Sequence, residues 1–275
     1  MTANLGTVLE VATATDPGMV RSHNEDSIGT DIDIGLAVLA DGMGGYNAGE
    51  VASGIAVAML TTEMRQALED HAPHEVDGSG EPLAEKFVRE NSAKGNAAIY
   101  QTAKSQPQYA GMGTTLVVCL FYDNRMTVGH IGDSRLYRLR QDTLEQVTRD
   151  HSLLQEQIDS GMVTKEQARY SQNKNLVTRA VGIDPDVETE IHTYNVEPGD
   201  IYLLCSDGLS DMVQDEDIHS TLSTLQSNLP LAATQLVQLA NDSGGRDNIS
   251  VILVRVIADF AVPTGWFAKF RAWFR

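Results

Sequence analysis

Short apolar segments with turn residues at both ends are the feature that most restricts how this chain can fold. They are rich in Val, Ile, Leu and Thr, and Gly, Asp, Asn or Pro flank them. Segments of this length and composition are typical of β-strands. We expect strands near residues 5–14, 27–40, 114–122, 125–130, 134–140, 187–194, 200–206 and 249–257.

A few longer segments carry helical signals instead. The first runs from about Asn47 to Leu68, where Asn47 can cap the helix and Glu50 follows three residues later. A second is expected from about Leu83 to Ala103, and a third from Leu231 to Asn241. Many antiparallel-type strands with a few segregated helices predict an α+β layered fold rather than repeated βαβ units.

Bulk composition narrows the function and the location. The 275 residues carry a net charge of -18, so there is no basic excess to attract nucleic acid. Cys119 and Cys205 lie in apolar runs, where buried thiols are expected rather than a disulfide framework. The N-terminus has no signal-peptide pattern, and no apolar run is long enough to span a bilayer. The expected location is the cytoplasm.

The segment from Asp150 to Lys174 differs from the rest of the chain. It is polar and rich in Gln, and its short helical pieces near 153–160 and 165–168 show little apolar periodicity. We expect it to lie over the surface as a mobile flap. The flap would belong to a single domain formed by residues 1–258.

Acidic residues recur where the expected strands end. Asp41 and Asp207 each precede a glycine directly after an apolar strand, Asp133 follows another strand, and Asp247 precedes the last one. A single Asp-Gly pair is usually only a turn. Several carboxylates held at rigid strand ends, without Cys or paired His ligands, favour a site for hard cations such as Mg²⁺ or Mn²⁺.

Seven short motifs in the same order resemble the PPM family of metal-dependent Ser/Thr protein phosphatases (type 2C), and the chain looks like a bacterial member. The motifs are R-x-x-N-E-D from Arg21, D-G-M-G-G from Asp41, G-x-G-T-T from Gly111, G-D-S-R from Gly132, T-R-A-x-G from Thr178, S-D-G-L from Ser206 and R-D-N from Arg246. Together they cover about residues 5–257, and their joint occurrence is specific although no single motif is.

This resemblance implies a fold and a role for each matching residue. The implied fold is a four-layer αββα sandwich, with two antiparallel sheets inside and helices outside. The implied roles are a metal bridge for Asp41, a carbonyl ligand for Gly42, further first-metal ligands for Asp207 and Asp247, water-mediated second-metal contacts for Glu25 and Asp26, a weaker third-metal site for Asp133 together with Asp207, and phosphate binding for Arg21. Asn248, which follows Asp247 in the motif, is implied to support the position of Asp247.

The implied reaction is hydrolysis of phosphoserine and phosphothreonine on proteins, and the implied role is to reverse the action of a bacterial Ser/Thr kinase. Two divalent cations, Mn²⁺ or Mg²⁺, would bridge one water or hydroxide and lower its pKa for in-line attack, and a third ion is also implied. Two alternatives stay open: a phosphatase-like regulatory or binding module with little turnover, and a phosphatase for small phosphate esters.

One position departs from many family members. Met43 stands where eukaryotic relatives place the His that is thought to protonate the leaving group, and Met carries no proton. Water at the third metal site is the first candidate for this acid. His23 is a weaker candidate, and His151 is equally an ordinary loop residue.

The C-terminal residues 259–275 lie beyond the family resemblance. After Pro263, the aromatic residues of TGWFAKFRAWFR would share one face of a helix, with Arg271 and Arg275 on the other. Such an amphipathic cationic helix is typical of docking to a membrane surface or a partner protein. Packing onto its own domain and disorder remain open for residues 263–275.

Overall fold

The fold is built on two antiparallel sheets that face each other. The computed structural model describes residues 5–45, 48–168 and 176–262. The first sheet has the strand order β1-β11-β10-β7-β8. Its strands are β1 (Leu9–Asp16), β7 (Arg135–Arg140), β8 (Thr143–Gln146), β10 (Ile201–Cys205) and β11 (Ile249–Val256).

The second sheet has the order β2-β3-β5-β6-β9, with the short strand β4 paired to the end of β3. Its strands are β2 (Asp26–Asp31), β3 (Leu36–Met43), β4 (Gly113–Thr114), β5 (Leu116–Tyr122), β6 (Arg125–Ile131) and β9 (Glu190–Asn195). Every strand pair in both sheets is antiparallel.

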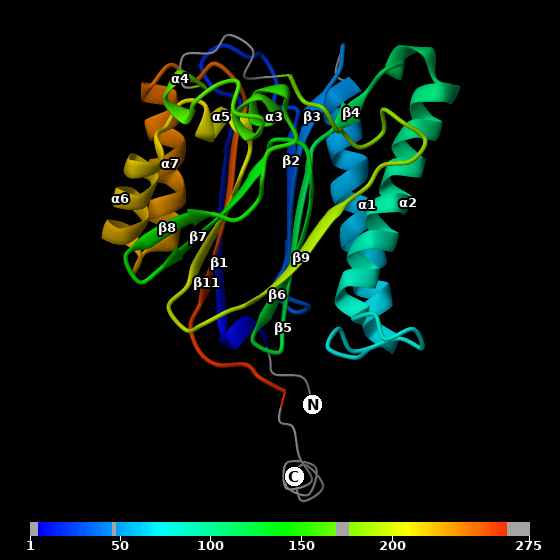
Figure 1. The fold of residues 1–275 in the computed structure, drawn as a ribbon, viewed down its shortest axis with the longest axis vertical. Helices are drawn as coiled ribbons and strands as arrows, with labels where there is room; N and C mark the ends of the chain where they lie inside the picture. Colours follow the sequence, from blue (N-terminus) through cyan, green and yellow to red (C-terminus); the bar gives the residue numbers. More distant parts are fainter. Residues whose placement is uncertain (1–4, 46–47, 169–175, 263–275) are drawn as a thin grey trace, which may run out of the picture.

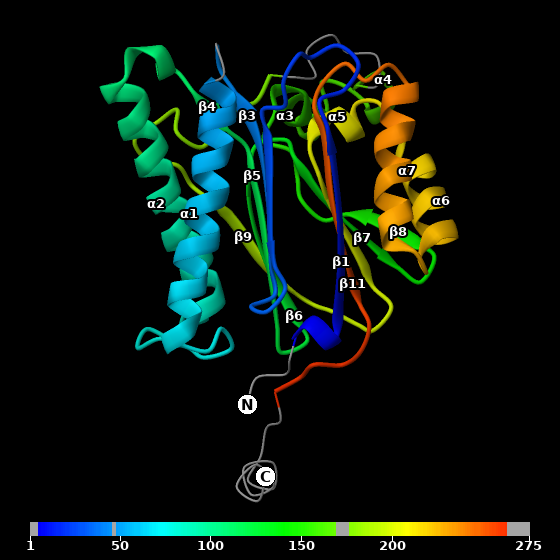
Figure 2. The same cartoon turned by 180° about the vertical axis from the view of Figure 1, so that it is seen from behind.

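Helices cover the outer face of each sheet, which makes four layers (Figures 1 and 2). The long helices α1 (Ala48–Asp70) and α2 (Leu83–Ser105) pack on the second sheet, and α6 (Asp215–Leu225) and α7 (Leu229–Asp242) pack on the first. The short helices α3 (Leu153–Asp159), α4 (Lys165–Ala168) and α5 (Asp207–Ser210) lie at one end of the sandwich. Single 3₁₀ turns cover Leu5–Thr7 and Pro107–Tyr109.

Strand β3 shows why the central strands read as continuous apolar runs. Val38 packs on the α1 side, whereas Leu39 packs between the sheets. Both faces of the strand are therefore buried, so the usual alternation of apolar and polar residues is absent. Between the sheets, Phe121 and Tyr202 meet edge to face with ring centroids 5.3 Å apart.

The predicted α+β sandwich is confirmed, and so are the three long helices, within a few residues at their ends. Asn47, the predicted cap of α1, lies outside the described residues, as do residues 263–275 and 169–174 of the predicted flap. Helices α5 and α6 and strand β8 were not predicted. Within the described residues, no helix combines the length and apolar character needed to cross a membrane.

Candidate active site

The predicted acidic residues gather at the end of the sandwich that is uppermost in Figure 1. Asp26 opens β2 and lies directly opposite Asp41 near the end of β3. From the facing sheet, Ser206 follows β10 and donates a hydrogen bond to Asp26 Oδ2 at 2.9 Å. Since Asp207 begins α5 immediately after Ser206, the two sheets bring their acidic ends together.

The electrostatics of these carboxyl groups show how closely they lie. Burial raises the pKa of Asp41 well above its usual value, and repulsion from Asp26, Asp207, Asp133 and Asp247 raises it further. Burial likewise raises the pKa of Asp207 well above its usual value, with the Asp133 charge the next cause. The ends of the strands therefore form a pocket of negative charge that favours either protons or cations.

Asp26 and Asp133 belong to the same cluster. Burial raises the pKa of Asp26 to about 6, although hydrogen bonds from Ser250 and Ser206 oppose the shift. One oxygen of Asp26, Oδ1, is buried and has no hydrogen-bond partner among the described residues. Burial also raises the pKa of Asp133 to about 7, and the charge of Asp150 adds to that effect.

Backbone packing around Asp41 explains the glycine that follows it. A Cβ atom on Gly42 would lie 2.1 Å from the carbonyl oxygen of Gly49 in the first turn of α1 and 2.5 Å from that of Glu25. Only glycine lets β3, α1 and the Glu25 segment approach this closely. This close packing fixes the strand end that carries Asp41, and buried carboxylates held in fixed positions are donors that hard divalent cations prefer.

Two threonines, quoted above only as part of a motif, hold the Asp41 backbone. Asp41 N–H donates to Thr115 Oγ1 at 3.0 Å, and Thr114 Oγ1 donates to Asp41 O at 2.8 Å. Thr115 Oγ1 also lies 2.7 Å from the hydroxyl of Ser134, the residue after Asp133. These hydroxyls thus link the strand that carries Asp41 to the turn that carries Asp133.

Arg21 and Glu25 lie on the loop between β1 and β2. They line a cavity of about 570 Å³ together with Ser22, His23, Gly44, Gly45 and Asn248. Arg21 Nη2 donates to Asp247 Oδ2 at 2.7 Å, and about half of the Arg21 side chain is exposed. Two residues predicted for different roles, phosphate binding and metal binding, are therefore paired with each other.

Asn248 anchors this loop through its side-chain amide. Its Oδ1 accepts from Glu25 N–H at 2.8 Å, and its Nδ2 donates to Pro17 O and His23 O, both at 2.9 Å. Asn248 was predicted to support Asp247, its neighbour in the motif. Its backbone N–H does contact Asp247 Oδ1 at 2.9 Å, but its side chain holds the loop of Arg21.

Asp133 lines a separate cavity of about 230 Å³ beside α3 and α4. The walls of this cavity include Arg135, Asp150 and Asp211. Asp150, the first residue of the predicted flap, is buried and accepts a paired hydrogen bond from Arg135. Asp211 was missed, although its spacing of four residues from Asp207 was a visible signal for one face of a helical turn.

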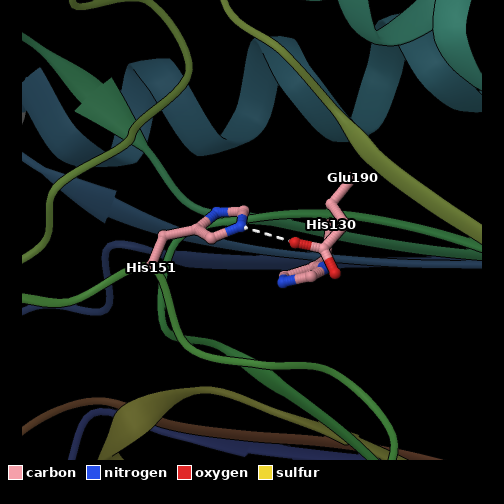
Figure 3. Close-up of side chains that lie close together, drawn as sticks. All are labelled: His130, His151 and Glu190. Carbon is pink, nitrogen blue, oxygen red and sulfur yellow. Dashed lines mark hydrogen bonds and ion pairs between the residues drawn. The ribbon is translucent and has the colours of Figure 1, made fainter. Parts of the chain in front are cut away.

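The two histidines considered as proton donors lie in different surroundings. His23 is exposed, contacts Ser22 and lines the cavity beside Arg21. His151 is buried, and its ring contacts His130 and Glu190 instead (Figure 3).

A model of the family Protein phosphatase 2C matches residues 20–241 of the chain. The chain belongs to this family. It is 39% identical over 255 residues to the serine/threonine protein phosphatase PstP of Mycobacterium tuberculosis, covering 93% of this chain and 46% of that protein. The chain therefore spans about half the length of that relative.

Other relatives match along nearly their whole length. The serine/threonine phosphatase stp of Listeria welshimeri is 36% identical over 243 residues, covering 87% of this chain and 93% of that protein. A crystal structure of the PstP catalytic domain with two manganese ions superposes with a TM-score of 0.80 at 37% identity, covering 91% of this chain and 99% of that chain. The matching family model and relatives confirm the family resemblance, and the superposed crystal structure confirms the sandwich fold.

Proposed function

We propose that this chain hydrolyses phosphoserine and phosphothreonine in proteins with the help of divalent cations. The observation that carries the proposal is the convergence of buried, mutually repelling carboxyl groups, Asp41 and Asp207 above all, at one end of the sandwich. The catalytic unit we propose is residues 1–258. The named phosphatases among its relatives, which are 39% and 36% identical to it over the aligned residues, support the same activity.

The cations would be held by the residues that the motifs indicate. They are Asp41 for both of the first two ions, Gly42, Asp207 and Asp247 for the first, Glu25 and Asp26 for the second, and Asp133 together with Asp207 for a weaker third. Bound divalent cations supply Lewis-acid chemistry and lower the pKa of a water molecule. The two manganese ions of the mycobacterial structure support Mn²⁺, and Mg²⁺ accepts the same oxygen donors.

Arg21 would bind the phosphoryl oxygens through its planar guanidinium. In the structure this group is paired with Asp247, and its side chain is half exposed beside the 570 Å³ cavity. An exposed ion pair is weak, so a phosphate dianion competes well for Arg21. Cation binding at Asp247 would weaken its pairing with Arg21, because the cation offsets the negative charge that attracts the guanidinium, and Arg21 would then be available to the substrate.

The test is turnover of a phosphothreonine peptide with Mn²⁺, with and without a chelator. We expect activity that the chelator abolishes, and a loss of at least about 10²-fold in kcat for Asp41→Asn. Asp142→Asn is the matched control, because the side chain of Asp142 is 90% exposed. Absence of metal-dependent turnover in the wild type would favour the binding-module alternative, and a higher kcat/KM for small esters than for peptides would favour the small-ester phosphatase.

The partners we propose follow from this activity. The substrates are phosphorylated Ser/Thr proteins, and the opposing enzyme is a Ser/Thr kinase. Docking of residues 263–275 to a membrane surface or a partner protein stays a prediction. Deletion of these residues should reduce binding to anionic vesicles, and unchanged vesicle binding and stability would contradict both docking and packing onto the domain.

A further inference from the structure

A second group of metal-type side chains lies apart from the acidic cluster. His130 on β6 and Glu190 on β9 are directly opposite each other, and His151 comes from the start of the 150–174 segment. Figure 3 shows the carboxyl group of Glu190 beside both imidazole rings. One ligand atom from each residue lies within 4.8 Å of the other two.

The hydrogen bonds of His130 leave one nitrogen without a partner. His130 Nε2 lies 2.8 Å from Arg149 O, so Nε2 carries the proton and donates it. His130 Nδ1 must then offer a lone pair, yet it is buried and has no partner among the described residues. The residue is only 1% exposed, and an unsatisfied buried acceptor is destabilising.

His151 is held by two long contacts. Its Nδ1 accepts from Gly132 N–H at 3.2 Å, and its Nε2 lies 3.2 Å from Glu190 Oε2. The imidazoles of His151 and His130 are stacked, with centroids 4.5 Å apart and planes 18° from parallel. A cation that binds both rings needs one of them to turn, and turning His151 breaks these two weak contacts and the stacking on His130.

The charges of the three groups suit a cation. Burial lowers the pKa of both His130 and His151, so their imidazoles are neutral at pH 7. Burial raises the pKa of Glu190, but hydrogen bonds from His192 and His151 outweigh that effect and lower the pKa to about 2. Because the two imidazoles are neutral and the carboxyl group is ionised, a metal at His151 Nε2 requires only that the His151 proton move from Nε2 to Nδ1.

We propose that His130, His151 and Glu190 bind one divalent transition-metal cation of the zinc type, with water as a fourth ligand. Two imidazoles and a carboxylate form a known zinc donor set, whereas Mg²⁺ and Mn²⁺ prefer the all-oxygen acidic cluster. His192 occupies Glu190 Oε1 at 2.9 Å, which leaves Oε2 for the cation. The ion would tie β6 and β9 to the start of the 150–174 segment, next to the Gly132–Asp133 turn.

Cobalt(II) titration of the intact chain, followed by visible absorption in excess Mg²⁺, tests this site. Four-coordinate cobalt with imidazole ligands absorbs strongly, whereas octahedral cobalt on oxygen ligands absorbs weakly. We expect a strong band that saturates at one equivalent in the wild type and is lost in Glu190→Gln and His130→Asn. His192→Asn is the matched control, since it changes a neighbour of Glu190 outside the donor set and should keep the band.

Two results would overturn the proposal: a wild type without the strong band, or a band that survives in both Glu190→Gln and His130→Asn. Circular dichroism and a cooperative thermal unfolding transition of the variants establish that they fold. A second measurement is the melting temperature with Zn²⁺ in excess Mg²⁺, which should rise for the wild type and stay constant for Glu190→Gln. Since the site is separate from the acidic cluster, this outcome does not depend on the proposed phosphatase activity.

Discussion

Asn248 is the residue whose single side chain holds most of the candidate substrate loop. Its amide makes three hydrogen bonds to backbone groups of residues 17–25, and it is 5% exposed. We expect Asn248→Ala to cost about 2–3 kcal/mol of stability, because the buried backbone groups lose their partners. We also expect KM to rise more than kcat falls, since the loop carries Arg21.

The control for Asn248→Ala is Asn228→Ala at the start of α7. Asn228 Oδ1 caps the helix by accepting from Leu231 N–H at 3.2 Å, so its loss should cost about 1 kcal/mol. Chemical denaturation gives both stabilities, and steady-state kinetics gives KM. Equal KM values for the two variants would show that Asn248 has no positioning role.

Replacing Asp41 by asparagine should change the melting temperature in opposite directions without and with metal, relative to the wild type. Burial and four neighbouring carboxylates oppose its ionisation, so Asp41→Asn removes a repulsive charge from the metal-free protein. We expect the metal-free variant to melt at a higher temperature than the wild type but to gain nothing from Mn²⁺. Differential scanning calorimetry with and without Mn²⁺ measures both effects, and a variant that Mn²⁺ stabilises normally would contradict the proposed bridge.

At the residue scale, the sequence predicted which carboxylates lie at the strand ends but not how they are held. Asp41, Asp133 and Asp207 stood at strand ends, and the structure brings their charges together. The bond from Ser206 to Asp26 joins residues 180 positions apart, and such a contact has no local pattern in the sequence. His130 and Glu190 were missed for the same reason, because only the β6–β9 pairing makes them neighbours.

At the scale of elements, the contact between α1 and β3 depends on Gly42. An alanine there would place its Cβ 2.1 Å from Gly49 O, so the helix would have to move away from the strand. We expect Gly42→Ala to lose about 1–3 kcal/mol of stability and most of the metal-dependent turnover. Urea unfolding and the phosphopeptide assay measure these two losses.

Gly54→Ala in the same helix is the matched control for Gly42→Ala. A Cβ on Gly54 would meet nothing within 4 Å, and alanine favours a helix over glycine by about 0.5–1 kcal/mol. This variant should therefore be more stable than the wild type and fully active. A Gly42→Ala protein that behaved like Gly54→Ala would disprove the close-packing argument.

Helix prediction succeeded for the long helices and for the short helices α3 and α4, and it failed for α5 and α6. Helices α1 and α2 are each 23 residues long, and both were predicted. Helix α6 was missed although Ile218, Thr221 and Leu222 follow the spacing of a buried helical face. Asp150 and Ser152 were expected on the surface, yet tertiary contacts bury them, including the ion pair from Arg135 to Asp150.

At the scale of the whole molecule, the strand pattern was compatible with a sandwich but did not establish one. The pairing of β1 with β11 joins the two ends of the chain, and no local rule selects it. The four layers followed from the family resemblance instead. The consequence of this arrangement is that acidic ends from both sheets share one small volume, so the stability of the whole fold depends on their charge.

The metal-free protein should therefore become less stable as the pH rises. The folded-state pKa is about 6 for Asp26 and about 7 for Asp133, both above the usual value of 3.8. A carboxyl group with a raised folded-state pKa contributes stability that is present below about pH 4 and is lost as the pH rises through 6 to 7. The net charge of -18 adds general repulsion in the same direction.

Divalent cations should reverse this dependence, because they replace the protons that the cluster favours at low pH. Mn²⁺ at about 100 times its Kd stabilises the folded state by about 2.7 kcal/mol. For a chain of this size that corresponds to a rise in Tm of roughly 5 °C. We expect the rise at pH 8 to exceed the rise at pH 5, where protons compete for the same carboxylates. Calorimetry at both pH values measures it, and an equal rise at the two would mean that Mn²⁺ binds outside the acidic cluster.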